Sequence, residues 1–142
     1  MNIADLRNRI ERELEAAKRE SGDRRRMIDD TQAAYASVLR DVAAPLFRQA
    51  VAVLRADNHG VSAHTPHDSV RLVSERSGED FIEIELDTRG RVPHLVGRTS
   101  VTRGKGVEVE EQPIAPDKPL AEIGDEDVVA FLVPAIRKLL VR

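Results

Sequence analysis

Apolar residues recur at helical spacing along residues 24–58, and the rest of the chain is organised around this stretch. The gaps between them are mostly four residues, with two gaps of three, which is the period of a helix and not of a strand. The stripe consists of Met27, Thr31, Tyr35, Val38, Val42, Leu46, Ala50 and Val53. We therefore predict one long helix here, or two in line, which ends at Asn58-His59-Gly60.

Pro45 lies inside this helical pattern. A proline removes one backbone hydrogen bond and clashes with the carbonyl group four residues before it, here that of Asp41. The helix should therefore kink, or a new helix should begin with Pro45 in its first turn. Because the stripe continues in phase through Leu46, we expect a kink.

The preceding segment, residues 3–20, carries a narrower apolar stripe on a strongly charged helix. Its members are Ile3, Leu6, Ile10, Leu14 and Ala17. Opposite charges four residues apart, such as Arg7 and Glu11, support the helix. A stripe this narrow is typical of a coiled-coil seam, although the repeat is shorter than three to four heptads. The alternative is a helix that packs on its own domain.

Ser21-Gly22-Asp23 separates the two helical patterns. We expect a turn or sharp bend here, because glycine inside a helix costs about 1 kcal/mol relative to alanine. Gly22 would end the first helix and Asp23 would cap the second. An i,i+4 pair of Glu20 with Arg24 argues the other way, since it would form only in a continuous helix.

From residue 61 onward, apolar and polar residues alternate with a period of two, which predicts β-strands. We place the strands at 61–65, 69–75, 80–87, 92–102 and 106–111. The links between them are short and rich in turn-forming residues. Such links favour an antiparallel meander of four or five strands, with one buried and one wet face.

The strand at 80–87 has the clearest alternation, with Ile82, Ile84 and Leu86 facing the core. The residues between them are carboxylates and should face water: Glu83, Glu85 and Asp87. A slip by one residue would bury all three, so the register is well specified. The inner rows of the neighbouring strands should be Val70, Leu72, Leu95, Gly97, Thr99, Val101, Val107 and Val109.

Prolines in residues 112–123 predict an extended connector, after which a last helix begins at Gly124 or Asp125. Acidic residues at its start and basic residues at its end suit the helix dipole. Pro134 lies inside it and should kink it. Its buried face should consist of Val128, Leu132, Ala135, Ile136 and Leu139.

The predicted fold class is α+β, in a single domain of residues 1–142. Its parts are an N-terminal helix (1–22), a long helix (23–58), the sheet (61–111) and a C-terminal helix (124–142). The first of these could project as an oligomerisation arm. Both later helices should cover one face of the sheet, because each has a single apolar face to bury.

The composition narrows the class of protein. The chain has 142 residues, of which 41 % are hydrophobic but only 3 % aromatic, so few rings remain to stack on single-stranded nucleic acid. A net charge of −3 provides no general attraction to nucleic acid or anionic membranes. The absence of cysteine excludes disulfides, thiolate nucleophiles and cysteine-ligated zinc. Together with the lack of a signal peptide and of a membrane-spanning stretch, this predicts a cytoplasmic protein.

Two groups of residues could bind a ligand. The first is a basic stretch in residues 89–105, which could contact phosphates or an acidic partner: Arg89, Arg91, Arg98, Arg103 and Lys105. The strands on either side are acidic, however, and Arg98 in the middle strand of the meander should pair with carboxylates from both neighbours. We therefore expect these cations to be mainly structural.

The second group is a set of histidines that could bind zinc or a similar metal: His59, His64 and His67. They do not have the spacing of a helical metal motif, and we interpret them as surface residues of a polar loop. No nucleophile motif or acid–base pair is visible elsewhere. The sequence therefore predicts neither a catalytic site nor a cofactor.

The leading hypothesis is a non-enzymatic interaction module or adaptor that self-associates, as a homodimer, through the stripe Ile3, Leu6, Ile10 and Leu14. The alternative is a small-ligand or nucleic-acid binder that uses the sheet and the basic stretch. A metal-dependent activity at the histidines is a third and weaker hypothesis.

Overall fold

The structure is a computed structural model that describes residues 1–66, 68–90 and 92–141. By their internal contacts its residues form two units, the N-terminal segment (Met1–Ala33) and the body (Ala34–Arg142). The elements are α1 (Ile3–Val38), the π-helical turn η1 (Leu39–Ala43), α2 (Ala44–Ala56), β1 (Val61–His64), β2 (Ser69–Ser74), β3 (Phe81–Asp87), β4 (His94–Arg103), β5 (Gly106–Ile114), the 3-10 turn η2 (Leu120–Glu122) and α3 (Asp125–Leu140).

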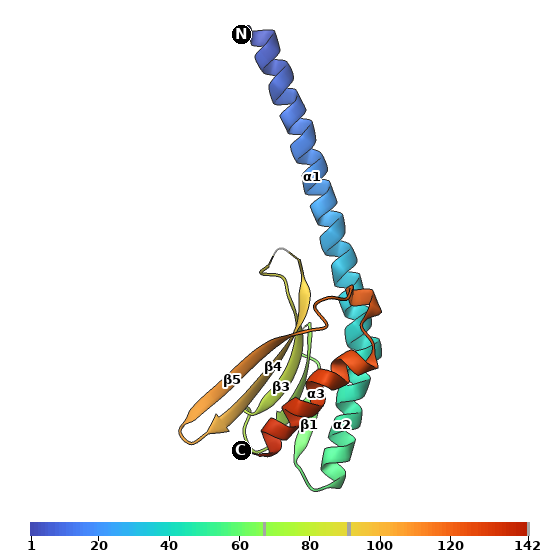
Figure 1. The fold of residues 1–142 in the computed structure, drawn as a ribbon, viewed down its shortest axis with the longest axis vertical. Helices are drawn as coiled ribbons and strands as arrows, with labels where there is room; N and C mark the ends of the chain where they lie inside the picture. The colour runs from blue at the N-terminus through green and yellow to red at the C-terminus, as the bar shows by residue number, and fades with distance from the viewer. Residues whose placement is uncertain (67, 91, 142) are drawn as a thin grey trace. The chain divides into compact units, whose positions relative to one another are not determined.

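The body contains one sheet of five strands in the order β1-β2-β3-β4-β5, and all neighbours are antiparallel. This is the predicted meander, and the α+β fold class is confirmed (Figure 1). Each link is short because antiparallel neighbours need only a turn between them, whereas parallel ones need a crossover.

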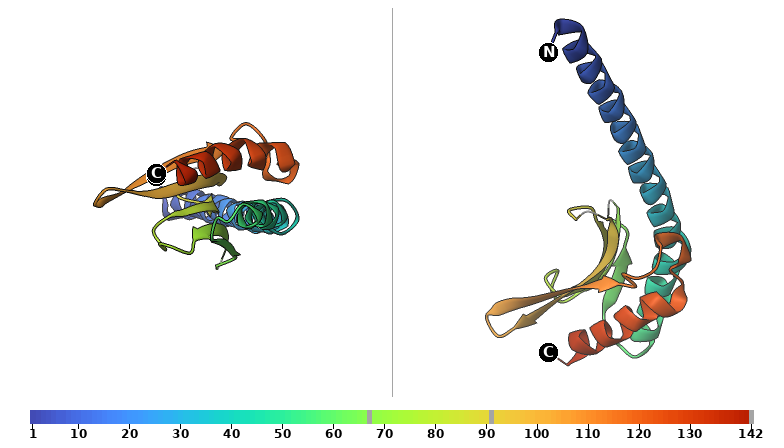
Figure 2. Two further views of the ribbon diagram at one scale, coloured as in Figure 1. Left: turned by 90° about the horizontal axis from the view of Figure 1, so that it is seen from below. Right: turned by 45° about the horizontal axis from the view of Figure 1, so that its top comes forward.

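One face of the sheet forms the core of the body, as the alternation in β3 predicted. Ile82 and Ile84 are fully buried and pair across to Thr99 and Gly97 of β4. α2 contacts β1 and β2, while α3 contacts β3, β4 and β5, so both helices cover the sheet (Figures 1 and 2). Gly97 permits the close approach of α3, because a Cβ there would stand 2.3 Å from the Phe131 ring.

β5 departs from the prediction in two ways. Its register pairs Val109 with Ser100 and Val107 with Thr102, so both valines lie on the outer face and are exposed. Their prediction as inner-row residues was wrong, because Val–Glu alternation looks the same whichever face is buried. The strand also includes Pro113, which we had placed in the connector. β5 is an edge strand, where a proline removes no ladder hydrogen bond that the sheet needs.

The stripe along α2 is shifted by one residue from its predicted positions. The buried members are Ala43 at the end of η1 and Phe47 and Leu54 of α2, while Val53, a predicted member of the stripe, is 70 % exposed. The π-helical turn η1 explains the shift, because a π-turn inserts one extra residue and rotates all that follow. It lies directly before Pro45, which stands in the first turn of α2 as our alternative had it.

The predicted turn at Ser21-Gly22-Asp23 was also wrong. α1 runs without interruption from Ile3 to Val38. A single glycine costs a helix only about 1 kcal/mol, which the hydrogen bonds of the adjoining turns outweigh.

α3 begins at Asp125, as predicted. The Asp127 carboxylate accepts a hydrogen bond from the Gly124 backbone N–H at 3.0 Å, which caps the helix start and lowers the pKa of that carboxyl group. Four of the five predicted inner residues are buried, Ile136 is partly buried, and Phe131 was missed. Pro134 lies on the exposed side inside the helix.

Candidate interaction surfaces

The N-terminal segment presents an uncovered row of large apolar side chains. Ile3, Leu6, Ile10 and Leu14 are 86, 48, 49 and 55 % exposed. Further along the same segment, Met27 and Ile28 are 51 and 48 % exposed. Scattered single apolar residues are normal on a protein surface, but a row at helical spacing over several turns is a candidate interaction face.

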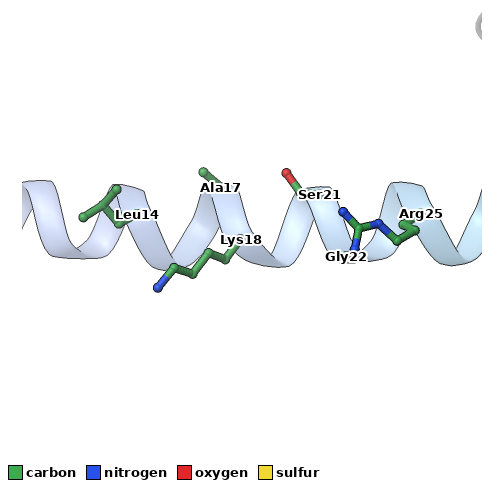
Figure 3. A pocket seen from close by; sticks show the side chains of 6 residues that line it. All are labelled: Leu14, Ala17, Lys18, Ser21, Gly22 and Arg25. Atoms are coloured by element: carbon green, nitrogen blue, oxygen red, sulfur yellow. The ribbon is translucent and has the colours of Figure 1, made fainter.

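Two shallow grooves follow this row. One is lined by Ile3, Leu6 and Ile10 together with the flanking charges Arg7 and Glu11. The other has a floor of small residues flanked by cations: Leu14, Ala17, Lys18, Ser21, Gly22 and Arg25 (Figure 3). Neither groove encloses a volume suited to a small ligand, since each is formed by a single helix.

The second surface is the outer face of the sheet, where Arg98 of β4 holds three carboxylates. It donates to Glu83 at 2.8 Å and to Glu85 at 2.6 Å on one side, and to Glu111 at 2.7 Å on the other. The predicted pairing with both neighbouring strands is therefore observed. These hydrogen bonds, above all that to Glu85, raise the pKa of the Arg98 guanidinium above its usual range.

Glu83 lies at the centre of this network and is held from both sides. Its side chain is only 4 % exposed, and it accepts from Arg71 of β2 as well as from Arg98. Arg71 also stacks on Phe81, with its guanidinium carbon 4.1 Å from the ring centroid. The sequence analysis missed Arg71 and Phe81. Both occupy outward positions in the predicted strands, and Arg71 pairs directly with Glu83 in the register.

The other cations of the basic stretch that the structure describes, Arg89, Arg103 and Lys105, lie at or beyond the ends of β3 and β4. Arg89 pairs with Asp87 at 3.0 Å, and Arg103 pairs with Glu108. The hydrogen bonds from the Arg89 side chain and backbone lower the pKa of Asp87 to about 2. Lys105 lies in the exposed turn between β4 and β5, and Arg91 falls outside the described residues. These paired charges do not form one compact anion site.

Of the histidines named as metal ligands, the structure describes His59 and His64, and each has a different neighbour. His59 Nε2 stands 3.2 Å from Asp57 Oδ2, whereas His64 Nε2 stands 3.0 Å from Ser62 Oγ on β1. His67 falls outside the described residues. Within the part of the chain that the structure describes, no group of three or more His, Asp or Glu side chains is placed to hold a metal ion.

Comparison of the chain with protein-family models, with curated proteins and with solved structures found no match. No helix of the described residues is both long and apolar enough to cross a membrane.

Proposed function

We propose that this protein is a non-enzymatic interaction module that self-associates through the apolar row of its N-terminal segment. The observation that carries the proposal is the exposure of Ile3, Leu6, Ile10 and Leu14 on one helix. Isolated helices are marginally stable in water, and most helical stability in proteins comes from packing an apolar face. A partner that buries this row would supply that packing.

The flanking charges support an interaction with another helix more than with a membrane. Both signs alternate along the segment, as in Arg7, Arg9, Glu11, Arg12 and Glu13. A helix that lies on an anionic membrane is instead rich in Lys and Arg on its polar face. Mixed charges beside a narrow apolar seam are typical of helices that pair and select their partner by salt bridges.

The outer face of the sheet lends less support to a ligand-binding function. Arg98, the best-placed cation, is surrounded by carboxylates that would repel a phosphate. The exposed apolar row of the N-terminal segment therefore supports an interaction better than the charged face of the sheet, whose central cation already pairs with carboxylates of the same chain.

The proposal is tested by replacing Leu6 and Ile10 together with Glu. Sedimentation equilibrium should give a self-associated wild type and a monomeric double variant, because two carboxylates in the apolar row cannot be desolvated cheaply. The body should keep its unfolding transition, since the segment has its own contacts.

The matched control is Asn8→Glu with Ala16→Glu. It adds the same two charges to the same helix, on exposed positions away from the row, and should leave the association unchanged. A wild type that sediments as a monomer at high concentration would refute the proposal.

A further inference from the structure

The N-terminal part of α1 can be described by a seven-residue repeat. A continuous seven-residue repeat can be laid along α1, with d positions at Ile3, Ile10 and Ala17 and a positions at Leu14, Ser21 and Ile28. Leu6 of the apolar row then falls beside the seam, at a g position. A seven-residue period suits two helices that wind around each other. We propose that the occupant of this seam is the same segment of a second copy of this chain, in parallel and in register. This inference rests on the proposed function and specifies its partner.

Charged residues at the positions that flank the seam favour a parallel pair. Glu13 and Glu20 occupy g positions, whereas Lys18 and Arg25 occupy e positions, five residues further along in each case. In parallel coiled coils a g residue of one helix meets the e residue five positions on in the other. Glu13 then meets Lys18, Glu20 meets Arg25, and the two-fold symmetry repeats both pairs.

The groove in Figure 3 presents one half of this arrangement. Its small floor residues, Ala17 and Ser21, belong to the seam, and its flanking cations, Lys18 and Arg25, belong to the e positions. A second helix could approach closely over such small residues, and its glutamates would then reach the two cations. The groove therefore complements in charge the helix edge formed by Glu13 and Glu20 of another copy.

An antiparallel pair is disfavoured by the same charges. In that orientation g positions face g positions, and the charged g residues are both glutamates, Glu13 and Glu20. In antiparallel alignments that pair the apolar residues of the two copies, Glu13 of one chain faces Glu13 or Glu20 of the other. Like charges at these positions destabilise the pair, whereas the parallel register has four attractive contacts.

Two features of the seam limit its strength. Arg7 and Arg24 occupy a and d positions, and each would face its own copy in a parallel pair. Polar residues in a seam fix register and oligomeric state at a cost in stability. The expected product is therefore a specific, reversible dimer.

The orientation can be read with single cysteines, because the natural chain has none. The probes are Ile3→Cys and Ser21→Cys, in separate full-length variants. Every seam position of a parallel, in-register dimer faces its own copy, within the ~4.4–6.8 Å between Cα atoms that a disulfide spans. Both variants should then form covalent dimers under mild oxidation and return to the uncrosslinked form on reduction.

In an antiparallel dimer, a residue faces the same residue of the other copy only where the two helices cross their common two-fold axis. The two probes stand 18 residues apart, which is about 27 Å along a helix, so such a dimer could crosslink one of them at most. The control is Arg19→Cys, on the outward side of the same turns, which should crosslink at least tenfold more slowly than Ser21→Cys.

The outcomes separate the two proposals. Crosslinking of both probes, with a slow control, supports the parallel pair. A wild type that sediments as a dimer but crosslinks at only one probe, or at neither, overturns the orientation and leaves self-association standing. A monomeric wild type overturns both.

Discussion

The N-terminal segment and the body use apolar residues at the same helical spacing but to different ends. In the segment, Leu6 and Ile10 are about half exposed, whereas Phe47 and Val128 in the body are fully buried. The body buries its helical stripes because the same chain supplies a sheet with an apolar face, against which the helices pack. A helical apolar stripe does not by itself show whether its face is buried within the chain, because that depends on the other elements that the same chain supplies.

The largest effect should follow from a cavity in the body. Ile84→Ala removes a fully buried side chain from the centre of β3 and should lower the free energy of unfolding by about 2–5 kcal/mol. Chemical denaturation measures this. Leu14→Ala, a similar truncation in the segment, is the matched comparison and should leave the body's transition in place. A loss below about 1 kcal/mol for Ile84→Ala would mean that β3 is peripheral.

A smaller effect is expected on the outer face of the sheet. Arg98→Met removes the charge and the hydrogen bonds that hold Glu83, whose side chain is 4 % exposed. We expect a loss of about 1.5–3 kcal/mol in unfolding free energy, the usual contribution of hydrogen bonds to charged groups. Arg103→Met breaks a pair whose partners are half exposed and should cost no more than about 1 kcal/mol. Equal losses for the two variants would contradict the central role of Arg98.

Gly22→Ala tests whether α1 is continuous at this position. Glycine in an exposed helix interior costs about 0.5–1 kcal/mol relative to alanine, and a Cβ at this position would meet no atom within 4 Å. The variant should therefore gain helical signal in circular dichroism and lose it at a higher temperature. A decrease in helical signal would indicate that a bend at Gly22, as the sequence first suggested, is the stable state.

The smallest effect concerns how the free energy of unfolding depends on acidic pH. The folded-state pKa of Asp87 is about 2, below its ordinary value of 3.8, owing first to the hydrogen bond from the Arg89 side chain. A lowered folded-state pKa gives a contribution to stability that is present above about pH 4 and is lost as the pH falls toward 2. The difference in unfolding free energy between the wild type and Asp87→Asn should therefore be constant near neutral pH and shrink in acid. A difference that grows in acid would contradict the assignment.

The strand alternation of the sequence was sufficient to predict the sheet. Ile82 and Ile84 face the core because they alternate with carboxylates, and a one-residue slip would expose the isoleucines and bury the acids. The same alternation predicted that Arg98 would reach carboxylates on both sides, since the middle strand of a meander has two acidic neighbours. For the proposed interface, the sequence singled out the row Ile3, Leu6, Ile10 and Leu14, and the structure added that these side chains are exposed.

Other features depended on the tertiary structure. The phase of the stripe along α2 changed by one residue at η1, because a π-helical turn arises from local backbone geometry that residue spacing does not encode. Val107 faced outward because pairing with β4, and not its own alternation, chose its side. Glu83 became buried because Arg71 and Arg98 close over it from two strands that are far apart in the sequence. Periodicity therefore determined which elements form and which residues of β3 face the core. A local π-helical turn set the phase of α2, whereas contacts between distant residues decided which side of β5 faces outward and that Glu83 is buried.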